Sequence, residues 1–403
     1  MIGRRLYEVA FDAEWGRQMR FVVGPRQAGK TTLAKLKLRE EGCEQLYYLW
    51  DLRRVRERAK DHELFFTEDG VDPSRKLWVC FAEIHKTPKW KNILKGAFDE
   101  TGDRYQFIVT GSAKLDIKKR AGDSLAGRYF VFRLLPLVLT EAAGRTERER
   151  TPETAEDFLE RRMAGAPADQ QALRTLLEYG GFPEPFQRQS RAFHRKWIRD
   201  YLDTVIREDI GSLTRIVDRE YLFDLCSLLP QAVGSPLSQA SLASHLQISP
   251  ITVRNYLRRL EDFYLVFSVR PYAKNIKRSL LKARKYYLYD WSRIENAAAR
   301  FENYVACELT ANLALWRDSS GFEWDLHYVR NKQKQETDFL VTREGRPWLL
   351  VETKLADGTV ARHHHVARSA LGNIPFVQVC LEPDVLSVQK RDVYRMSAGR
   401  LFG

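Results

Sequence analysis

The first third of the chain alternates short apolar runs with more polar stretches that have helical character. The strand-like runs lie at residues 20–23, 46–49, 77–81 and 105–109. Continuous apolar strands with helices between them are typical of a parallel sheet that is covered on both faces. The pattern therefore predicts an α/β domain over residues 1–145.

Three further segments follow this domain. Residues 146–212 are charged and carry no strand pattern, which predicts a helical lid or linker. Residues 213–275 contain a short helix, a turn, a second helix that starts at Ser249 and Pro250, and a strand, which is the order of a winged helix. Residues 276–403 give a helix, three strands, a helix and a strand, which predicts a second α/β domain.

The strand at 20–23 runs directly into a loop that fits the pattern G-x-x-x-x-G-K-T. Its glycines allow successive backbone N–H groups to point at phosphate oxygens, and the helix that follows adds its N-terminal dipole. Lys30 places a positive charge on the β- and γ-phosphates, and the Thr31 hydroxyl is a ligand for Mg²⁺. We predict that ATP with Mg²⁺ binds at the loop residues Gly24, Pro25, Arg26, Gln27, Ala28, Gly29, Lys30, Thr31 and Thr32.

A P-loop usually works with acidic residues at the end of a second strand, and here that position follows the strand at 77–81. Glu83 is placed to polarise the attacking water. The residue before it, where an aspartate normally holds Mg²⁺ through water, is Ala82. We therefore expect nucleotide binding with weakened hydrolysis, and the sequence leaves open whether Ala82 is natural or introduced. Ser112, after the strand at 105–109, is a candidate for sensing phosphate or orienting water, with a simple turn as the alternative.

Composition narrows the class of protein and its partners. The 403 residues are 44% hydrophobic and 30% charged, and no apolar stretch approaches the length of a membrane span. The five cysteines are scattered and never in C-x-x-C spacing, so we expect reduced thiols, no zinc site and a cytoplasmic location. Lys and Arg exceed Asp and Glu by 66 to 53, a net charge of +13. Such an excess favours a polyanionic partner such as DNA, with a solvated basic surface as the alternative.

The helix that starts at Ser249 would be the recognition helix of the winged helix. Its polar face suits phosphates and base edges in a DNA groove, and docking to a protein is the alternative for such a module. The densest basic stretch, 274–285, would follow a DNA backbone or act as a solvated linker. The DNA-binding residues predicted from both segments are Thr252, Arg254, Asn255, Arg258, Arg259, Lys274, Lys277 and Arg278.

The C-terminal segment carries a second candidate for chemistry. Asp338 lies in one predicted strand, and Glu352 and Lys354 lie at the end of the next. Two carboxylates on adjacent strands can share a divalent metal, and the lysine can position the attacking water. Glu302 in the preceding helix is the candidate third ligand. The order of elements resembles the PD-(D/E)xK nuclease fold, which implies metal-dependent DNA cleavage or a fold kept only to bind DNA. The histidine run at 363–365 is expected to be polar helix surface rather than a metal site.

The joint order of several short motifs resembles one group of prokaryotic AAA-type P-loop ATPases. The motifs are the phosphate loop, Glu83-Ile84-His85-Lys86, Thr110-Gly111-Ser112, Ser124-Leu125-Ala126-Gly127-Arg128 and Gly180-Gly181-Phe182-Pro183-Glu184. Members of this group carry a C-terminal domain of unknown function with a nuclease-like fold, and the residue matching Ala82 is usually Asp. The resemblance implies ring-shaped homo-oligomers in which an arginine reaches a neighbour's nucleotide. That role falls on Arg128, with a structural salt bridge as the alternative.

These features lead to one function and one alternative. The first is an ATP-binding protein that acts on branched or duplex DNA, in repair, recombination, mobile-element or defence processes, with a metal-dependent nuclease as a further candidate activity. The alternative is a nucleotide-controlled switch that binds proteins and does not process DNA. Ala82 favours the switch, because a switch tolerates slow hydrolysis.

Overall fold

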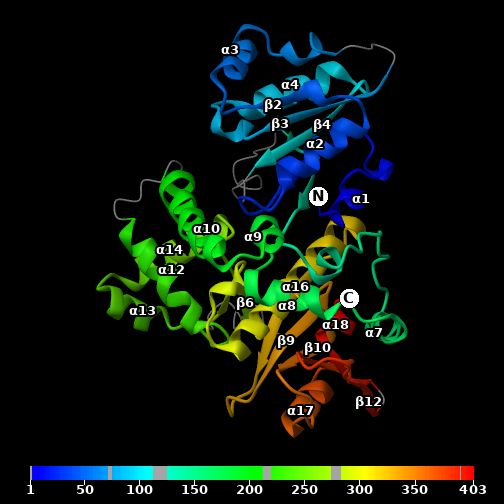
Figure 1. The fold of residues 1–403 in the computed structure, drawn as a ribbon, viewed down its shortest axis with the longest axis vertical. Coiled ribbons are helices and arrows are strands. Elements are labelled where there is room, and N and C mark those ends of the chain that lie inside the picture. The colour runs from blue at the N-terminus through cyan, green and yellow to red at the C-terminus, as the bar shows by residue number, and fades with distance from the viewer. Residues whose placement is uncertain (1, 71–74, 112–124, 212–218, 274–282, 391) are drawn as a thin grey trace. The chain divides into compact units, whose positions relative to one another are not determined.

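The computed structural model describes residues 2–70, 75–111, 125–211, 219–273, 283–390 and 392–403. Within them the chain forms two compact units. One is Arg4–Leu135, and the other is Pro136–Gly403 together with the first residues of the chain. Each unit has a β-sheet of its own (Figure 1).

The unit Arg4–Leu135 is built on a five-stranded sheet in which all neighbouring strands are parallel. The strands are β1 (Met19–Val23), β2 (Tyr47–Leu49), β3 (Leu77–Ala82), β4 (Tyr105–Gly111) and β5 (Tyr129–Arg133), in the order β2-β3-β4-β1-β5. β1, β3 and β4 are buried along their whole length, as continuous apolar runs in a covered sheet should be. The predicted α/β class is confirmed for this unit, although β5 was not among the predicted strands.

Helices connect and cover these strands: α1 (Leu6–Ala10), α2 (Lys30–Glu40), α3 (Arg53–Asp61) and α4 (Trp90–Thr101). α2 begins directly after the phosphate loop, since Gly29 is its N-cap. β4 lies between β1 and β3 in the sheet, and the Glu83 N–H donates to the Thr110 carbonyl at 2.9 Å. Because parallel strands end at one edge, the phosphate loop, the end of β4 and Glu83 meet at the same edge of the sheet.

The unit Pro136–Gly403 begins with helices, as the absence of strand patterns in 146–212 predicts. They are α6 (Leu139–Ala142), α7 (Ala155–Ala164), α8 (Gln170–Tyr179), α9 (Pro183–Arg188), α10 (Arg191–Asp203), a π-helical segment Thr204–Ile210, α12 (Glu220–Ala232), α13 (Gln239–Leu246) and α14 (Pro250–Asp262). The predicted start of α14 is confirmed: Ser249 accepts the Thr252 N–H, and Pro250 is in the first turn. The winged-helix assignment of this region stays a prediction.

A mixed eight-stranded sheet follows, in the order β12-β13-β11-β10-β9-β8-β6-β7. Its strands are β6 (Val266–Pro271), β7 (Lys285–Leu288), β8 (Trp324–Arg330), β9 (Glu336–Arg343), β10 (Arg346–Lys354), β11 (Phe376–Cys380), β12 (Leu386–Lys390) and β13 (Val393–Ser397). Three helices belong to the same region: α16 (Ala297–Ser320), α17 (Arg362–Ala370) and α18 (Ala398–Leu401). β6 pairs with β8, so residues on both sides of the expected boundary at 275 share this sheet.

The long helix α16 packs against β7, β8 and β10. It buries aromatic and aliphatic side chains against the sheet. The helix ends at Gly321, which has the left-handed conformation that glycine favours. Its residue Glu302 is therefore brought to strands that lie far away in the sequence. This packing positions the predicted carboxylate site.

Two further expectations concern cysteines and membranes. All five cysteines are free and buried, which agrees with the expectation of reduced thiols. Across the part of the chain that the structure describes, no helix is long and apolar enough to cross a membrane.

Candidate functional site

The phosphate loop in the unit Arg4–Leu135 has the backbone that its glycines predict. Gly24 and Gly29 have φ angles of 153° and 100°, which favour glycine. Gly24 also lies against the neighbouring backbone, because a Cβ added there would be 2.0 Å from the Leu134 carbonyl oxygen. The Lys30 side chain is buried and donates to the Gly24 and Pro25 carbonyls at 3.0 and 2.6 Å. A phosphate group offers the same ammonium stronger acceptors than these carbonyls.

The residues of this loop fit Mg²⁺-bound ATP. Thr31 is exposed at the start of α2, beside the Tyr47 phenol. Glu83 lies at the same sheet edge, and its Oε2 atom is buried and has no hydrogen-bond partner within the described ranges. An orphaned buried carboxylate oxygen is the kind of acceptor that a positioned water satisfies. The Mg²⁺ ligand predicted from the protein is the Thr31 hydroxyl, and the remaining ligands would be phosphate oxygens and water.

The electrostatics of Glu83 are set by burial and by four charged neighbours. Burial raises the pKa of its carboxyl above the ordinary value, the positive charges of Lys86, Lys30 and Arg26 oppose that rise, and Asp51 adds to it. Lys86 lies 3.7 Å from Glu83 and bonds both oxygens of Asp51 at 2.9 Å. Since its pKa is raised, the ionised Glu83 carboxylate is a stronger base than an ordinary glutamate, which suits the activation of a water molecule.

The structure adds two residues to this site that the sequence analysis missed. Asp51 follows β2, the strand that pairs with β3, and its charge reaches Glu83. Arg4 donates to the Ala28 carbonyl of the phosphate loop at 2.6 Å and also to the Leu135 carbonyl. The signal for Asp51 was an acidic residue at the end of a predicted strand. Arg4 had none, since it lies far from the loop in the sequence.

Two other predicted residues of this unit have different outcomes. Ser112 lies outside the described residues. Arg128 forms a two-bonded ion pair with Asp99 of α4, at 2.8 and 2.9 Å, which raises the pKa of the guanidinium and lowers that of the carboxyl. The alternative of a salt bridge within the chain is what the structure contains. An arginine that reaches a neighbour's nucleotide would first have to leave Asp99.

The C-terminal carboxylates lie close enough to influence one another. Glu302 on α16 has its pKa raised by burial and by the charge of Asp338 on β9. Its Oε1 atom accepts from Lys285 at 3.1 Å and from the Tyr287 phenol at 2.8 Å, and Lys285 also bonds Glu336 at 2.6 Å. Burial lowers the pKa of Lys285, but the carboxylates of Glu302, Asp338 and Glu336 outweigh it and hold that pKa above its ordinary value.

The predicted pair on β9 and β10 is also satisfied from within the chain. Asp338 accepts the N–H and the hydroxyl of Thr353, at 2.9 and 2.6 Å, and its own N–H donates to Glu352 at 3.2 Å. Lys354 donates to Glu352 at 2.6 Å. Burial, with Asp338 beside it, raises the pKa of Glu352 to about 7. Adjacent strands thus bring together Asp338, Glu352 and Lys354 as the sequence predicts.

Two lysines partly neutralise the carboxylates of this cluster. Searched over the described residues, the chain has no group of three or more His, Cys, Asp or Glu side chains that could hold a metal ion. That Glu302, Asp338 and Glu352 form one metal site therefore stays a prediction. Lys285 supplies positive charge to Glu302, and Lys354 supplies it to Glu352.

The histidine run at 363–365 differs in part from the expectation of polar helix surface. His364 is only 2% exposed, its Nδ1 atom lies 2.9 Å from the Thr337 hydroxyl, and its ring packs against Phe376. Burial and the neighbouring His363, Lys354 and His365 lower its pKa to about 3. His364 is thus a neutral core residue and not polar surface.

The predicted DNA-binding face of α14 is largely at the surface. Its core stripe Val253, Leu257 and Leu260 is buried, while Arg254, Asn255, Arg258 and Arg259 are exposed. Arg259 lies 3.6 Å from Asp262. Thr252 differs from the prediction, because it is half-buried and its hydroxyl bonds the Ser249 cap at 2.8 Å. Lys274, Lys277 and Arg278 lie outside the described residues.

Three protein-family models match different ranges of the chain. Residues 16–143 match a family model described as "AAA domain". This part of the chain is thus similar to an AAA domain. Residues 170–303 and 298–397 match two models that are both described as domains of unknown function, DUF8612 and DUF4143. The AAA part and the C-terminal domain of unknown function agree with the resemblance seen in the motifs, and its winged-helix and nuclease-like parts stay predictions.

Two uncharacterized bacterial proteins and one solved structure align with most of this chain. An uncharacterized protein of Mycobacterium tuberculosis is 24% identical over 375 residues, which cover 89% of this chain and 75% of that protein. An uncharacterized protein of Haemophilus influenzae is 22% identical over 315 residues, covering 72% and 74%. The solved structure of the Aeropyrum pernix Orc1 protein in complex with DNA aligns with 77% of this chain and 92% of its own, at 15% identity and a TM-score of 0.28. A TM-score of this size does not establish a common overall fold.

Proposed function

We propose that this chain is an ATP-binding protein that acts on DNA and hydrolyses ATP slowly. The observation that carries the DNA part is the face of α14. There, Arg254, Asn255 and Arg258 are exposed above a buried stripe that holds the helix in place. A fixed helix with such a face supplies both phosphate contacts and base-edge contacts. The net charge of +13 adds a long-range attraction to a polyanion.

The ATP part of the proposal rests on the phosphate loop and the AAA domain. Lys30 and the loop N–H groups would hold the phosphates, and Thr31 would hold Mg²⁺, which neutralises phosphate charge when bound. Phosphates next to Lys30 would remove part of the positive influence on Glu83, so its pKa would rise further. Because Ala82 provides no carboxylate, metal placement relies on Thr31 and the nucleotide itself. The missing carboxylate slows hydrolysis more than it weakens binding, because the loop and Lys30 still hold the phosphates.

The DNA part is tested by the salt dependence of binding to duplex and four-way DNA. Arg254→Gln and Arg258→Gln should each lower affinity and reduce the slope of log affinity against log salt by about one. Lys60→Gln is the matched control, since Lys60 is an exposed residue of α3 and loses the same charge. Binding that is insensitive to salt, or equal losses in the control, would overturn this part of the proposal.

The alternative of a nucleotide-controlled switch that binds proteins is favoured by Ala82, because a switch tolerates slow hydrolysis. Ala82→Asp should restore a metal-positioning carboxylate and raise phosphate release. Turnover of this variant is then measured with and without DNA. Stimulation by DNA supports action on DNA, whereas turnover that is indifferent to DNA supports the switch.

We further propose that the domain with the C-terminal carboxylate cluster binds DNA but does not cleave it. Lys285 is paired with Glu302 and Glu336, and Lys354 with Glu352, which lowers the negative charge that could recruit a metal. Single-stranded, duplex and four-way DNA should stay intact in Mg²⁺ or Mn²⁺. Cleavage that disappears in Asp338→Ala would refute this assignment and restore the nuclease hypothesis.

A further inference from the structure

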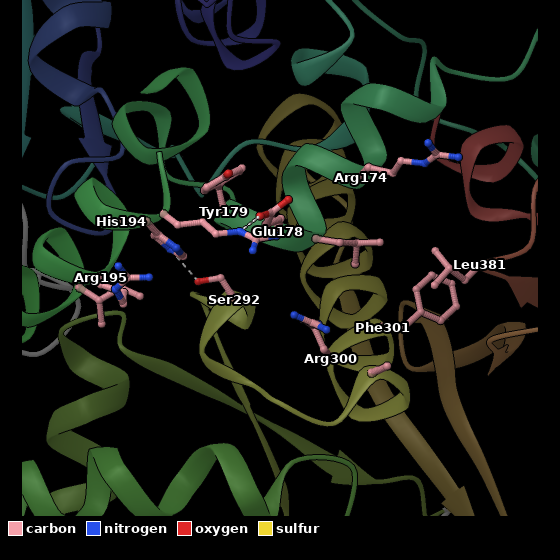
Figure 2. A pocket seen from close by; sticks show the side chains of 13 residues that line it. Arg174, Glu178, Tyr179, His194, Arg195, Ser292, Arg300, Phe301 and Leu381 are labelled. Atoms are coloured by element: carbon pink, nitrogen blue, oxygen red, sulfur yellow. Dashed lines mark hydrogen bonds and ion pairs between the residues drawn. The ribbon is translucent and has the colours of Figure 1, made fainter. Parts of the chain in front are cut away.

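One hollow in the unit Pro136–Gly403, of about 610 Å³, is lined by α8, α10, the start of α16 and the turn at Ser292 (Figure 2). Figure 2 shows His194 directed at Ser292, and Arg191 beside Glu178, which it bonds at 2.8 Å. The other arginines of the lining lie on separate sides of the hollow. Its charged groups therefore do not converge on one point, as those of a ligand site would.

The exposed face of α14, in the same unit, has an isoleucine at its centre. Ile251 is followed by Asn255 and Arg258, four and seven residues further along the helix, which is the spacing of one helix face. All three side chains are exposed, and this face lies opposite the buried core stripe of α14. Ile251 is 61% exposed, more than any other exposed large hydrophobic residue within the described ranges.

The surroundings of Ile251 are positively charged. A single exposed apolar side chain is common on protein surfaces, so its neighbours have to indicate what it contacts. Residues 250–260 of α14 include three arginines and neither Asp nor Glu. Arg259 is partly neutralised by Asp262 at 3.6 Å, and the other two arginines lie on the exposed side of the helix with Ile251. An apolar side chain within a cationic face complements duplex DNA, which combines phosphates with base edges that are partly apolar.

The start of α14 is held in a fixed conformation. The connection from α13 consists of residues 247–249, and Gln247 has the left-handed conformation with a φ of 55°. Ser249 accepts the Thr252 N–H at 3.0 Å, and Pro250 restricts the backbone of the first turn. Short connections of this kind are typical of helix-turn-helix motifs, in which the N-terminal residues of the second helix contact base edges. Ile251 lies in that N-terminal turn.

The central side chains of this face match the groups that an A·T base pair presents in the major groove. An asparagine amide bonds N6 and N7 of adenine together, and an apolar side chain contacts the C5 methyl group of thymine. Ile251 and Asn255 are one helix turn apart, about 6 Å along the axis. Base pairs follow one another at roughly 3.4 Å, so the two side chains would contact the same or neighbouring base pairs.

We propose that Ile251 makes α14 selective for thymine, through contact with the C5 methyl group in the major groove of duplex DNA. This inference rests on the proposed function, because it requires that α14 binds DNA. Asn255 would contact an adjacent adenine, while Arg254 and Arg258 would hold the phosphates. The inference extends the proposed function from attraction by charge to a sequence preference. Docking of Ile251 on a protein is the alternative, and it predicts no dependence of DNA binding on the methyl group.

The test removes the methyl group and the isoleucine side chain, separately and together. The full chain is titrated by anisotropy with a fluorescein-labelled duplex of alternating deoxyadenosine and thymidine, and with the same duplex containing deoxyuridine in place of thymidine. Deoxyuridine lacks only the C5 methyl group. The unmutated chain should bind the thymine duplex about fourfold more tightly, as expected for the burial of one methyl group. Ile251→Ala should bind both duplexes equally, because alanine does not reach the methyl group.

Val366→Ala is the matched control. Val366 is also an exposed β-branched residue, at 58%, and it lies on α17 of the same unit. This variant should keep the preference for thymine. Ile251→Ala removes no charge, so the slope of log affinity against log salt should be that of the unmutated chain. Unchanged thermal unfolding midpoints confirm that both variants are folded.

The outcomes separate this inference from the proposed function. Loss of the thymine preference in Ile251→Ala but not in Val366→Ala supports the role of Ile251. Salt-sensitive binding that is equal for the two duplexes would overturn the inference and leave the DNA function in place. A preference that persists in Ile251→Ala would also overturn it, since another group would then contact the methyl. Absence of salt-sensitive binding to either duplex would overturn the proposed DNA function as well.

Discussion

Replacing Lys285 by methionine should destabilise the unit Pro136–Gly403 strongly. Lys285 is fully buried and bonds Glu302 at 3.1 Å and Glu336 at 2.6 Å. Removing one partner of a buried pair leaves an uncompensated carboxylate and typically costs 3–5 kcal/mol, so we expect a loss of about 3–5 kcal/mol. Adding Glu302→Gln should recover much of this loss, because Glu336 keeps a second cation, Arg330, at 3.8 Å.

The loss should depend on pH with a defined sign. The folded-state pKa of Glu302 is raised above its ordinary value, first by burial and then by Asp338, while Lys285 holds it down. A raised carboxyl pKa means that the ionised form opposes folding, so the penalty is present above the folded pKa and disappears below the unfolded one. Without Lys285 the pKa rises further. The deficit of the variant should therefore be largest at neutral and alkaline pH and shrink as the pH falls.

Urea unfolding followed by hydrogen exchange in peptides of α16 and β9 measures this loss apart from the unfolding of the unit Arg4–Leu135. Arg330→Met is the matched control, because it removes a cation from the same carboxylate, Glu336, at a longer distance and greater exposure. The control should cost no more than about 1 kcal/mol. A loss below about 1 kcal/mol for Lys285→Met, or a deficit that does not change with pH, would refute the role given to this lysine.

Three further predictions concern the unit Arg4–Leu135. Gly24→Ala should abolish binding of a non-hydrolysable ATP analogue in fluorescence titrations, because its Cβ would meet the Leu134 carbonyl oxygen at 2.0 Å; binding within threefold of the unmutated chain would contradict this. Glu83→Gln should keep the affinity for the analogue and lower phosphate release at least tenfold. Unchanged phosphate release would show that Glu83 takes no part in water activation. Arg128→Gln should leave the thermal unfolding midpoint nearly unchanged, since its pair with Asp99 is at the surface, but it should reduce turnover if the arginine acts on a neighbouring subunit.

Local sequence was sufficient for the phosphate site. Gly24, Gly29 and Lys30 are close together in the chain, and the strand and helix on either side are strongly patterned, so the loop could be predicted from spacing alone. Glu83 followed from the end of one further buried strand. The influence of Asp51 on Glu83 could not be predicted from the sequence, because it requires β2 to lie beside β3 in the sheet.

The carboxylate cluster shows where such prediction stops. The hairpin of β9 and β10 is local, so the proximity of Asp338 and Glu352 was foreseeable from two strands close in sequence. Lys285 was read as part of a basic stretch. It reaches Glu302 only because β7 joins the sheet through β6 and β8, and α16 then packs across them. The residue that decides whether a metal fits thus depends on long-range pairing that no local pattern reports.

The two units share one electrostatic feature, which bears on how the chain works. Where a P-loop enzyme or a metal nuclease would use carboxylates on a metal, this chain pairs them with its own lysines: Lys86 with Asp51 in one unit, and Lys285 and Lys354 in the other. An ammonium group neutralises a carboxylate but offers no open coordination position for water or phosphate. The paired carboxylates balance the charge of each site without a metal ion. This arrangement of charges agrees with the proposal that the chain binds ATP and turns it over slowly.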